Sequence, residues 1–275
     1  MYNKLYGKKS DNMNKHKAKK HFGQNFLTDK NLLNKIVEEA NIENKDVIEI
    51  GPGMGALTQF LVKKAKTVTA YEIDLDLKRA LNQLEKEHEN LTIKFEDILK
   101  VEIPKDKTYD VVANIPYNIT SPIIFKLLDT PNINSATLMV QKEVCDRITS
   151  KPGTKDYNAL TVIINYYMKV RRIINVSKKL FRPVPKVDSA VFQMIRREKE
   201  LNDDEEKLFI EIVKSSFHQK RKTLLNNLSF SFETNKEKIN EMLQKLNINS
   251  SERAENITLE QFIELTKSWN NIKNS

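Results

Sequence analysis

The sequence predicts an α/β protein, with a mostly parallel sheet covered by helices on both faces and a small all-helical domain after it. Short apolar strands alternate with amphipathic helices between residues 29 and 149. Strands that are apolar throughout are typical of a parallel sheet buried on both faces. Beyond residue 205 the apolar spacing is helical only, which separates a second domain.

The first expected helix follows an N-cap at Thr28 or Asp29 and carries Leu32, Leu33, Ile36 and Val37 on one face. Strands are expected at 46–50, 67–72, 92–95, 110–113 and 136–140, with helices reaching residue 64 and at 74–85 and 121–128. After helices at 141–149 and from 158, strands 169–176 and 190–196 are expected to pair antiparallel at the sheet edge. The helices of the second domain are expected at 205–217, 221–229, 235–246 and 258–269.

These patterns predict four segments along the 275 residues. They are a flexible basic arm at 1–20, a main domain at 21–197, a charged linker at 198–204 and a helical domain at 205–275. The arm holds seven lysines against one aspartate and shows no periodicity.

Composition excludes several classes of protein. One cysteine, Cys145, and four scattered histidines form neither a disulfide framework nor a metal-binding pattern, so no metal is expected. No apolar run is long enough to cross a membrane, and residues 1–20 lack the apolar stretch of a signal peptide. We therefore expect a cytoplasmic protein with no membrane association.

The net charge of +9 is concentrated in clusters. Besides the arm, residues 169–186 contain seven Lys or Arg and no acid, and Lys220, Arg221 and Lys222 are consecutive. Clustered cations favour a polyanionic partner such as RNA, because neutralised phosphates release condensed counterions. A solvated, lysine-rich surface is the alternative.

Gly51, Gly53 and Gly55 follow strand 46–50 at the turn into the next helix. Glycine allows a tight turn and a close approach of the backbone to a ligand. The G-x-G-x-G spacing departs from the dinucleotide fingerprint, and no P-loop lysine follows, which argues against nucleoside triphosphate hydrolysis. A tight turn without a ligand is an alternative for the glycines alone.

Acidic residues follow the next two strands. Glu72 comes 21 residues after Gly51, where a carboxylate can accept hydrogen bonds from both ribose hydroxyls of an adenosine-containing ligand. Asp97 follows strand 92–95 and can accept from an adenine amine, although alone it is more typical of a loop carboxylate. Ligands of open α/β sheets bind at the carboxyl ends of the strands, where these groups and Asn114 converge.

The stretch Asn114-Ile115-Pro116-Tyr117 ends strand 110–113. The Asn114 side-chain oxygen and the Ile115 carbonyl can each accept an N–H of an adenine amine, and so direct the nitrogen lone pair toward an electrophile. Pro116 stiffens the turn and Tyr117 offers a stacking face. Such a pocket requires a flipped or unpaired base. A turn with a core tyrosine is the alternative for this stretch in isolation.

Seven segments carry a family resemblance: "KKHFGQNFL" (19–27), "EIGPGMGALT" (49–58), "NIPYNITSPI" (114–123), "QKEVCDRI" (141–148), "FRPVPKVDSAV" (181–191), "KRKTLLNNL" (220–228) and "RAENITLEQF" (253–262). With them the chain resembles the small-subunit ribosomal RNA adenine-N6,N6-dimethyltransferase family over residues 18–265. The resemblance implies a Rossmann-like class I methyltransferase domain with a mostly parallel seven-stranded sheet. It also implies dimethylation, from S-adenosylmethionine, of two adjacent adenosines in a hairpin loop near the 3′ end of small-subunit rRNA.

The resemblance also implies roles for individual residues. The cofactor pocket is expected to contain Asn25, Leu27, Gly51, Gly53, Glu72, Asp97 and Asn114. Asn114 and Tyr117 are expected to hold the target base, and Phe181 to pack on its other face; without the resemblance Phe181 is more typical of a core phenylalanine. Lys220, Arg221 and Lys222 are the expected RNA contacts, and the protein is expected to act as a monomer on the assembling small subunit. His21 stands where the family often has Arg or Lys.

Three other functions are weighed against this one. The related large-subunit rRNA methylase of macrolide resistance is the nearest enzyme, and "FRPVPKVDSAV" and "RAENIT" favour the small-subunit family over it. A DNA adenine methyltransferase would use a similar Asn/Asp-Pro-aromatic motif, but the helical tail domain argues against this function. A non-catalytic assembly or transcription factor on the same scaffold would not need Asn114 and Tyr117 intact.

Overall fold

The structure is a computed structural model that describes residue 19 and residues 24–273. It divides into two compact units. Unit 1 contains the described residues up to Cys145 together with Arg171–Ile195, and unit 2 contains Asp146–Val170 and the described residues from Arg196 onward. The expected basic arm, apart from Lys19, and His21 lie outside the described residues.

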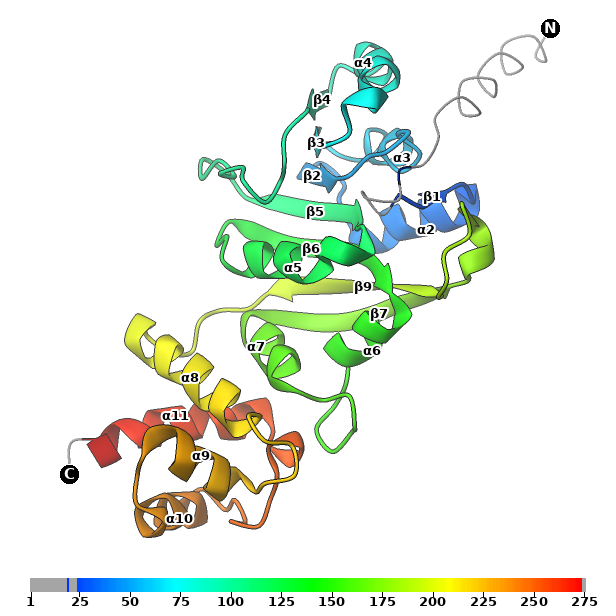
Figure 1. The fold of residues 1–275 in the computed structure, drawn as a ribbon. Helices are drawn as coiled ribbons and strands as arrows, with labels where there is room; N and C mark the ends of the chain where they lie inside the picture. The colour runs from blue at the N-terminus through cyan, green and yellow to red at the C-terminus, as the bar shows by residue number, and fades with distance from the viewer. Residues whose placement is uncertain (1–18, 20–23, 274–275) are drawn as a thin grey trace, which may run out of the picture. The chain divides into compact units, whose positions relative to one another are not determined.

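Unit 1 is built on a seven-stranded, mostly parallel sheet with helices on both faces (Figure 1). The strand order is β4-β3-β2-β5-β6-β9-β7, in which the pairs from β4 to β6 are parallel and β9 pairs antiparallel to β6. The chain proceeds from β2 outward to β4 and then returns to β5 on the other side of β2. The strands are β2 (Asp46–Ile50), β3 (Thr67–Tyr71), β4 (Leu91–Lys94), β5 (Tyr109–Asn114), β6 (Ile133–Gln141), β7 (Met168–Val176) and β9 (Ser189–Arg196).

Every strand expected from the apolar runs is present, within three residues of the predicted ends. The helices α2 (Lys30–Ala40), α4 (Lys78–Lys86), α5 (Thr120–Leu128) and α6 (Lys142–Ile148) are also at the expected places. The helix after the glycine turn, α3, covers only Thr58–Leu61 and is shorter than expected. The Asn90 amide donates to the Val62 and Ala65 carbonyls at 2.9 and 3.1 Å, which satisfies carbonyls that a longer helix would have used.

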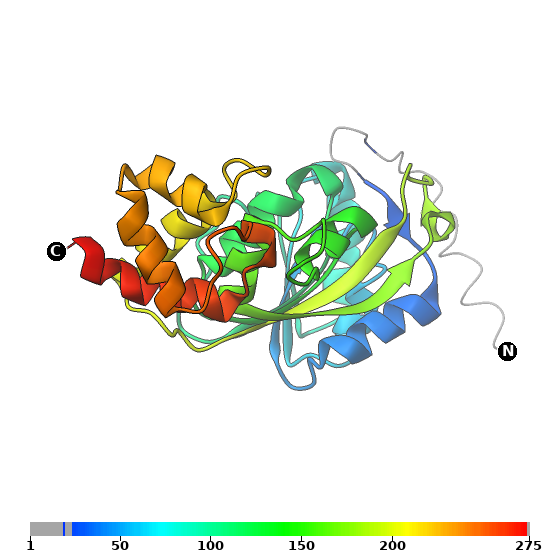
Figure 2. The ribbon, with the colours of Figure 1, turned by 90° about the horizontal axis from the view of Figure 1, so that it is seen from below.

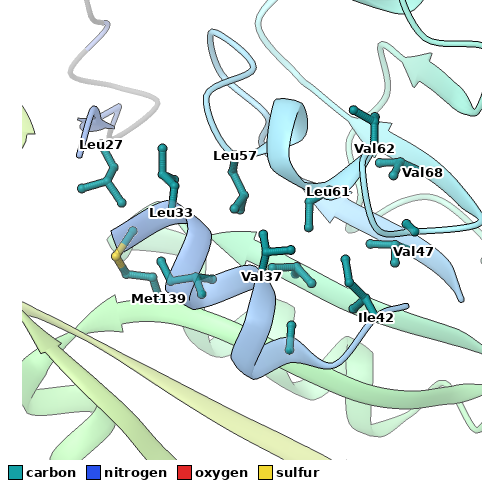
Figure 3. Close-up of a cluster of buried hydrophobic side chains, with 14 of the residues drawn as sticks. Leu27, Leu33, Val37, Ile42, Val47, Leu57, Leu61, Val62, Val68 and Met139 are labelled. Atoms are coloured by element: carbon teal, nitrogen blue, oxygen red, sulfur yellow. The ribbon is translucent and has the colours of Figure 1, made fainter. Parts of the chain in front are cut away.

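Helix α2 starts at an N-cap, since the Asp29 carboxylate accepts a hydrogen bond from the Leu32 N–H at 2.8 Å. Its buried face carries the predicted apolar residues. Figure 3 shows Leu33 and Val37 of α2 in the same cluster as Leu57 and Leu61 and as Met139 of β6. This cluster holds the glycine turn and the N-terminal segment on the sheet.

A second, two-stranded sheet was not predicted. β1 (Phe26–Leu27) pairs antiparallel with β8 (Phe181–Arg182), with Leu27 opposite Phe181. Figure 2 shows the blue segment that contains β1 beside the yellow-green segment that contains β8. Strands of two residues carry no periodic signal, so the sequence cannot indicate this pairing.

Unit 2 consists mainly of helices: α7 (Ala159–Tyr167), α8 (Asp203–Ser216), α9 (Leu224–Phe232), α10 (Lys236–Lys245) and α11 (Leu259–Lys273). The last four confirm the predicted helices. Helix α8 begins within the last residues of the predicted linker, because Asn202 and Glu205 form a capping box there. None of the helices in the described part of the chain is long and apolar enough to cross a membrane.

The sequence-based division placed residues 146–170 in the main domain, whereas the structure groups them with the C-terminal helices. Tyr166 of α7 packs its ring 4.6 Å from that of Phe209, and its hydroxyl accepts the Leu201 N–H at 3.2 Å. The Tyr157 hydroxyl donates to the Ile257 carbonyl at 2.9 Å. Helical periodicity shows which face of α7 is buried but not which element covers it.

Candidate functional site

A cavity of about 130 Å³ lies in unit 1 at the carboxyl ends of β2, β3 and β5 and beside the segment after β4. The position between β2 and β5 is where the strand order reverses, which is the ligand site of open α/β sheets. The residues predicted to bind the cofactor all line this cavity, and so does the predicted catalytic Tyr117: Asn25, Leu27, Gly51, Gly53, Glu72, Asp97, Asn114 and Tyr117.

The glycine turn is left-handed at Gly51 and Gly53, with φ values of 68° and 57°. A side chain is strained at such angles. A Cβ at Gly51 would meet no atom within 4 Å, whereas a Cβ at Gly53 would come 2.9 Å from Phe26 Cε1. The turn therefore leaves space for a ligand at Gly51, and the Phe26 ring closes over Gly53.

Glu72 has a carboxylate that is already well hydrogen-bonded. Its Oε2 accepts the Gly53 N–H at 3.0 Å, and its Oε1 accepts the N–H groups of Ile73 and Asp74, both at 2.9 Å. Burial raises the Glu72 pKa, while these backbone donors oppose the rise. A carboxylate offers about four acceptor positions, so this conformation leaves room for about one ribose hydroxyl and not for the two expected.

Asp97 and Asn114 line the cavity from two different strand ends, after β4 and at the end of β5. The Asp97 Oδ1 accepts the Leu99 N–H at 3.0 Å, which fixes the carboxylate in its turn. The Asn114 Nδ2 donates to the Asn25 carbonyl at 3.2 Å. That bond assigns the orientation of the amide, so that Oδ1 is the atom presented as an acceptor.

Tyr117 stands on a short 3-10 helix, η3 (Tyr117–Ile119), directly after Pro116. Its hydroxyl lies 2.8 Å from Ser189 Oγ, a buried group at the start of β9. Burial raises the Tyr117 pKa above its ordinary value of 10, so the phenol is neutral near pH 7. The ring is half-buried. The turn after Pro116 holds it at the backbone end, and the contact with Ser189 holds it at the hydroxyl end.

Phe181, predicted to pack on the target base, is 1% exposed and belongs to the apolar cluster around α2. It does not line the cavity, because its pairing with Leu27 in the β1–β8 sheet turns it into the core. As placed here, the ring presents no face to a ligand. A stacking role for Phe181 requires the ring to leave this core and stays a prediction.

Glu49 was not singled out from the sequence, although it is part of "EIGPGMGALT". It lines the cavity, is 1% exposed, and its Oε2 has no hydrogen-bond partner among the residues that the structure describes. Burial raises its pKa from 4.5 to about 8, and the nearby Glu72 charge adds to the rise. An acid between two isoleucines at the end of the strand that enters the glycine turn is the signal that would have found it.

The N-terminal segment is tied to the rim next to Glu72. Lys19 Nζ lies 2.6 Å from Asp74 Oδ1, and Gln24 Nε2 donates to Asp74 Oδ2 at 2.7 Å. These contacts hold residues 24–27 in the cavity wall. Asp74 thus anchors a segment that the sequence indicated only through the family resemblance.

Comparisons with known proteins agree with this geometry. A sequence profile described as "Ribosomal RNA adenine dimethylase" matches residues 15–271. The chain belongs to the ribosomal RNA adenine dimethylase family. Its S-adenosylmethionine-dependent dimethyltransferase activity and Rossmann-like class I fold follow from that membership, and the sequence-based predictions of both are confirmed.

Relatives of the dimethylase cover nearly its whole length. It is 48% identical over 262 residues to "Ribosomal RNA small subunit methyltransferase A" of Aster yellows witches'-broom phytoplasma (strain AYWB), over 92% of this chain and 97% of the relative. The solved dimethyladenosine transferase from Plasmodium falciparum is similar with a TM-score of 0.78 and 29% identity, over 90% and 98% of the two chains. The 23S rRNA methyltransferase ErmE is similar with a TM-score of 0.76 and 29% identity, over 90% and 100%.

The predicted RNA contacts lie outside this cavity. Lys220, Arg221 and Lys222 are exposed in the loop between α8 and α9 of unit 2, and their contact with RNA stays a prediction. No group of three or more His, Cys, Asp or Glu in the described chain is arranged to hold a metal ion.

Proposed function

We propose that this dimethylase transfers methyl groups to the N6 amines of two adjacent adenosines in a hairpin loop near the 3′ end of small-subunit rRNA, giving N6,N6-dimethyladenosines. The observation that carries the proposal is the orientation of Asn114, whose Nδ2 is held by the Asn25 carbonyl at the end of β5. An amide fixed in this way presents a hydrogen-bond acceptor to an amine and not a donor. We further propose that the enzyme acts in the cytoplasm, as a monomer, on the assembling small subunit.

The cavity fits the cofactor. When bound, S-adenosylmethionine supplies an electrophilic methyl group on a positively charged sulfur. Glu72 would accept a hydrogen bond from a ribose hydroxyl, and Asp97 would accept one from the adenine amine. The open space at Gly51 would let the cofactor lie against the protein backbone. Glu49 has a buried, unpartnered oxygen, which suits the ammonium group of the methionine part.

Asn114 and Ile115 would activate the target amine. The lone pair of an adenine amine is delocalised into the ring, so the nitrogen is a weak nucleophile. Acceptance of its two N–H groups by the Asn114 Oδ1 and the Ile115 carbonyl favours the pyramidal nitrogen and stabilises the positive charge that develops. The Ile115 N–H donates to the Met139 carbonyl at 3.1 Å, which ties the backbone of Ile115 to β6.

Tyr117 would stack on the target base. The contact of its hydroxyl with Ser189 holds the ring in one orientation before the base arrives, so little rotamer freedom is lost on binding. The amine proton can pass to water after transfer, and no side chain in the cavity is required as a strong base. Most of the rate enhancement then comes from proximity and orientation.

The fold alone does not identify the RNA substrate, since a dimethyladenosine transferase and a 23S rRNA methyltransferase are similar to this chain with TM-scores of 0.78 and 0.76. The names of the curated relatives favour the small subunit. The test is to incubate immature small subunits and naked large-subunit rRNA separately with a labelled methyl donor and to map the modified bases. We expect label on two adjacent adenines of small-subunit rRNA; label on large-subunit RNA alone, or on neither, contradicts the proposal.

A further inference from the structure

The helical unit has a hollow that the proposed function does not use. It has a volume of about 460 Å³ and lies between the α8–α9 loop, α9 and the start of α10. Its walls include Gln219 and Lys222 from the loop, Asn226 and Phe230 from α9, and Lys236 from α10. Most of these groups are polar, so the hollow is not a defect of apolar packing.

The hollow is held open by hydrogen bonds on both sides. The buried amide of Asn227 donates to the carbonyls of Ser216 and Gln219 at 2.7 and 3.2 Å, and its Oδ1 accepts the Gln219 N–H at 3.3 Å. On the other side, Ser229 Oγ donates to the Thr234 carbonyl at 3.1 Å. The loop and the start of α10 are therefore fixed to α9, and the hollow exists before any ligand binds.

Phe230 is unusual in its exposure. Its side chain is 67% exposed, the largest value among the exposed apolar side chains of the described chain. The ring lies nearly parallel to that of His218, at 15° with centroids 6.0 Å apart. An exposed aromatic ring beside polar and cationic groups is the arrangement on which unpaired bases stack.

The charges around the hollow are complementary to a phosphate backbone. Residues 218–238 contain Lys220, Arg221, Lys222, Lys236 and Lys238 against Glu233 and Glu237. Lys222 and Lys236 line the hollow, and neither acid does. Neither lysine forms a salt bridge with any described residue, so both ammonium groups are available to an anion.

We propose that this hollow binds one unpaired nucleotide of single-stranded RNA, at a site separate from the methyl-transfer pocket. The base stacks on Phe230, the amides of Gln219 and Asn226 meet its polar edge, and Lys222 and Lys236 hold the flanking phosphates. The amides and the aromatic ring favour RNA over an acidic peptide, which would need the cations alone. The proposal rests on RNA being the substrate, as proposed above.

The test is fluorescence titration of the full chain with a single-stranded RNA of about eight nucleotides that contains one 2-aminopurine. We expect the fluorescence to be quenched on binding to the wild-type protein. Phe230→Ala should weaken binding about tenfold and remove most of the quenching, because the stacking contact with the base is lost. Phe230→Trp should restore both. Lys236→Gln should weaken binding, and Lys238→Gln, an exposed change on the same helix outside the hollow, should have a smaller effect.

Unchanged affinity and quenching in Phe230→Ala, or equal effects of Lys236→Gln and Lys238→Gln, would overturn the proposal. Thermal unfolding and cofactor binding of each variant, expected to match the wild-type protein, show that the chain has folded. The result is distinguishable from failure of the proposed function, because the wild-type protein is tested for methylation of small subunits independently of these variants.

Discussion

The hydroxyl of Tyr117 and Oγ of Ser189 lie 2.8 Å apart, although the two residues are 72 positions apart in the chain. Tyr117 follows β5, and Ser189 begins β9, which is antiparallel to β6. The contact therefore joins the end of the parallel part of the sheet to its antiparallel edge. It gives the motif "FRPVPKVDSAV" a structural role at the proposed target-base pocket, since Ser189 positions the stacking ring.

Tyr117→Phe and Ser189→Ala should each lower kcat/KM for methyl transfer by about twofold to tenfold, the usual value of one hydrogen bond. Each change removes the same contact and leaves the ring or the strand in place. The double variant should be no worse than either single one, because the interaction is already lost. The measurement is a double-mutant cycle in kcat/KM, and multiplicative effects of the two changes would contradict the positioning role.

Gly53→Ala should weaken cofactor binding at least about tenfold. The added Cβ would come 2.9 Å from the Phe26 ring at a left-handed residue, so the Phe26 ring must shift in the cavity wall. Gly153→Ala is the matched control, because Gly153 is also left-handed, with φ of 81°, but its Cβ would meet nothing closer than 4.0 Å. Both variants should lose about 1 kcal/mol of stability, and calorimetry should find weaker cofactor binding only in Gly53→Ala.

Glu49→Gln should become more stable relative to the wild-type protein as the pH rises. Burial raises the Glu49 pKa from 4.5 to about 8, so the folded state binds this proton more tightly than the unfolded state does. Between these two values the wild-type protein loses stability with increasing pH, and a glutamine avoids that loss. Melting temperatures of both proteins from pH 5 to pH 8 measure the difference. A difference in melting temperature that does not change with pH would show that the Glu49 pKa is not raised by burial.

The sequence predicts the sheet and the cavity wall because both depend on local patterns. Apolar runs and glycine turns located β2 and its loop, and Glu72, Asp97 and Asn114 were found at the ends of successive strands. The family resemblance added Asn25 and Leu27, which come from a segment with no periodic signal.

The remaining features depend on tertiary packing. The pairing of Leu27 with Phe181, which buries the latter, joins residues 154 positions apart in the chain. The hydrogen bond from the Gly53 N–H to Glu72 depends on the exact path of the glycine turn. The assignment of α7 to the helical unit depends on its contacts with Phe209 and Leu201. No local pattern specifies which partner a buried face meets.

Neutralising Lys220, Arg221 and Lys222 together to Gln should weaken RNA binding and reduce its dependence on salt. Each phosphate contact contributes about 0.7 to the slope of log Kobs against log salt for single strands, so the slope should fall by up to about 2. The measurement is RNA affinity at several salt concentrations for the wild-type and triple-variant proteins. Parallel lines would mean that these side chains do not contact phosphates.

The most direct test of the central claim is the Asn114→Ala variant, studied in two assays on the same preparation. If the Asn114 Oδ1 accepts the target amine, single-turnover methyl transfer to small-subunit rRNA should fall by about 100-fold or more, while the cofactor Kd changes by less than about threefold, within the value of one hydrogen bond. Asn34→Ala, an exposed amide of α2 outside the cavity, should leave both unchanged. Equal losses of cofactor binding and transfer in Asn114→Ala, or transfer that persists, would contradict the account.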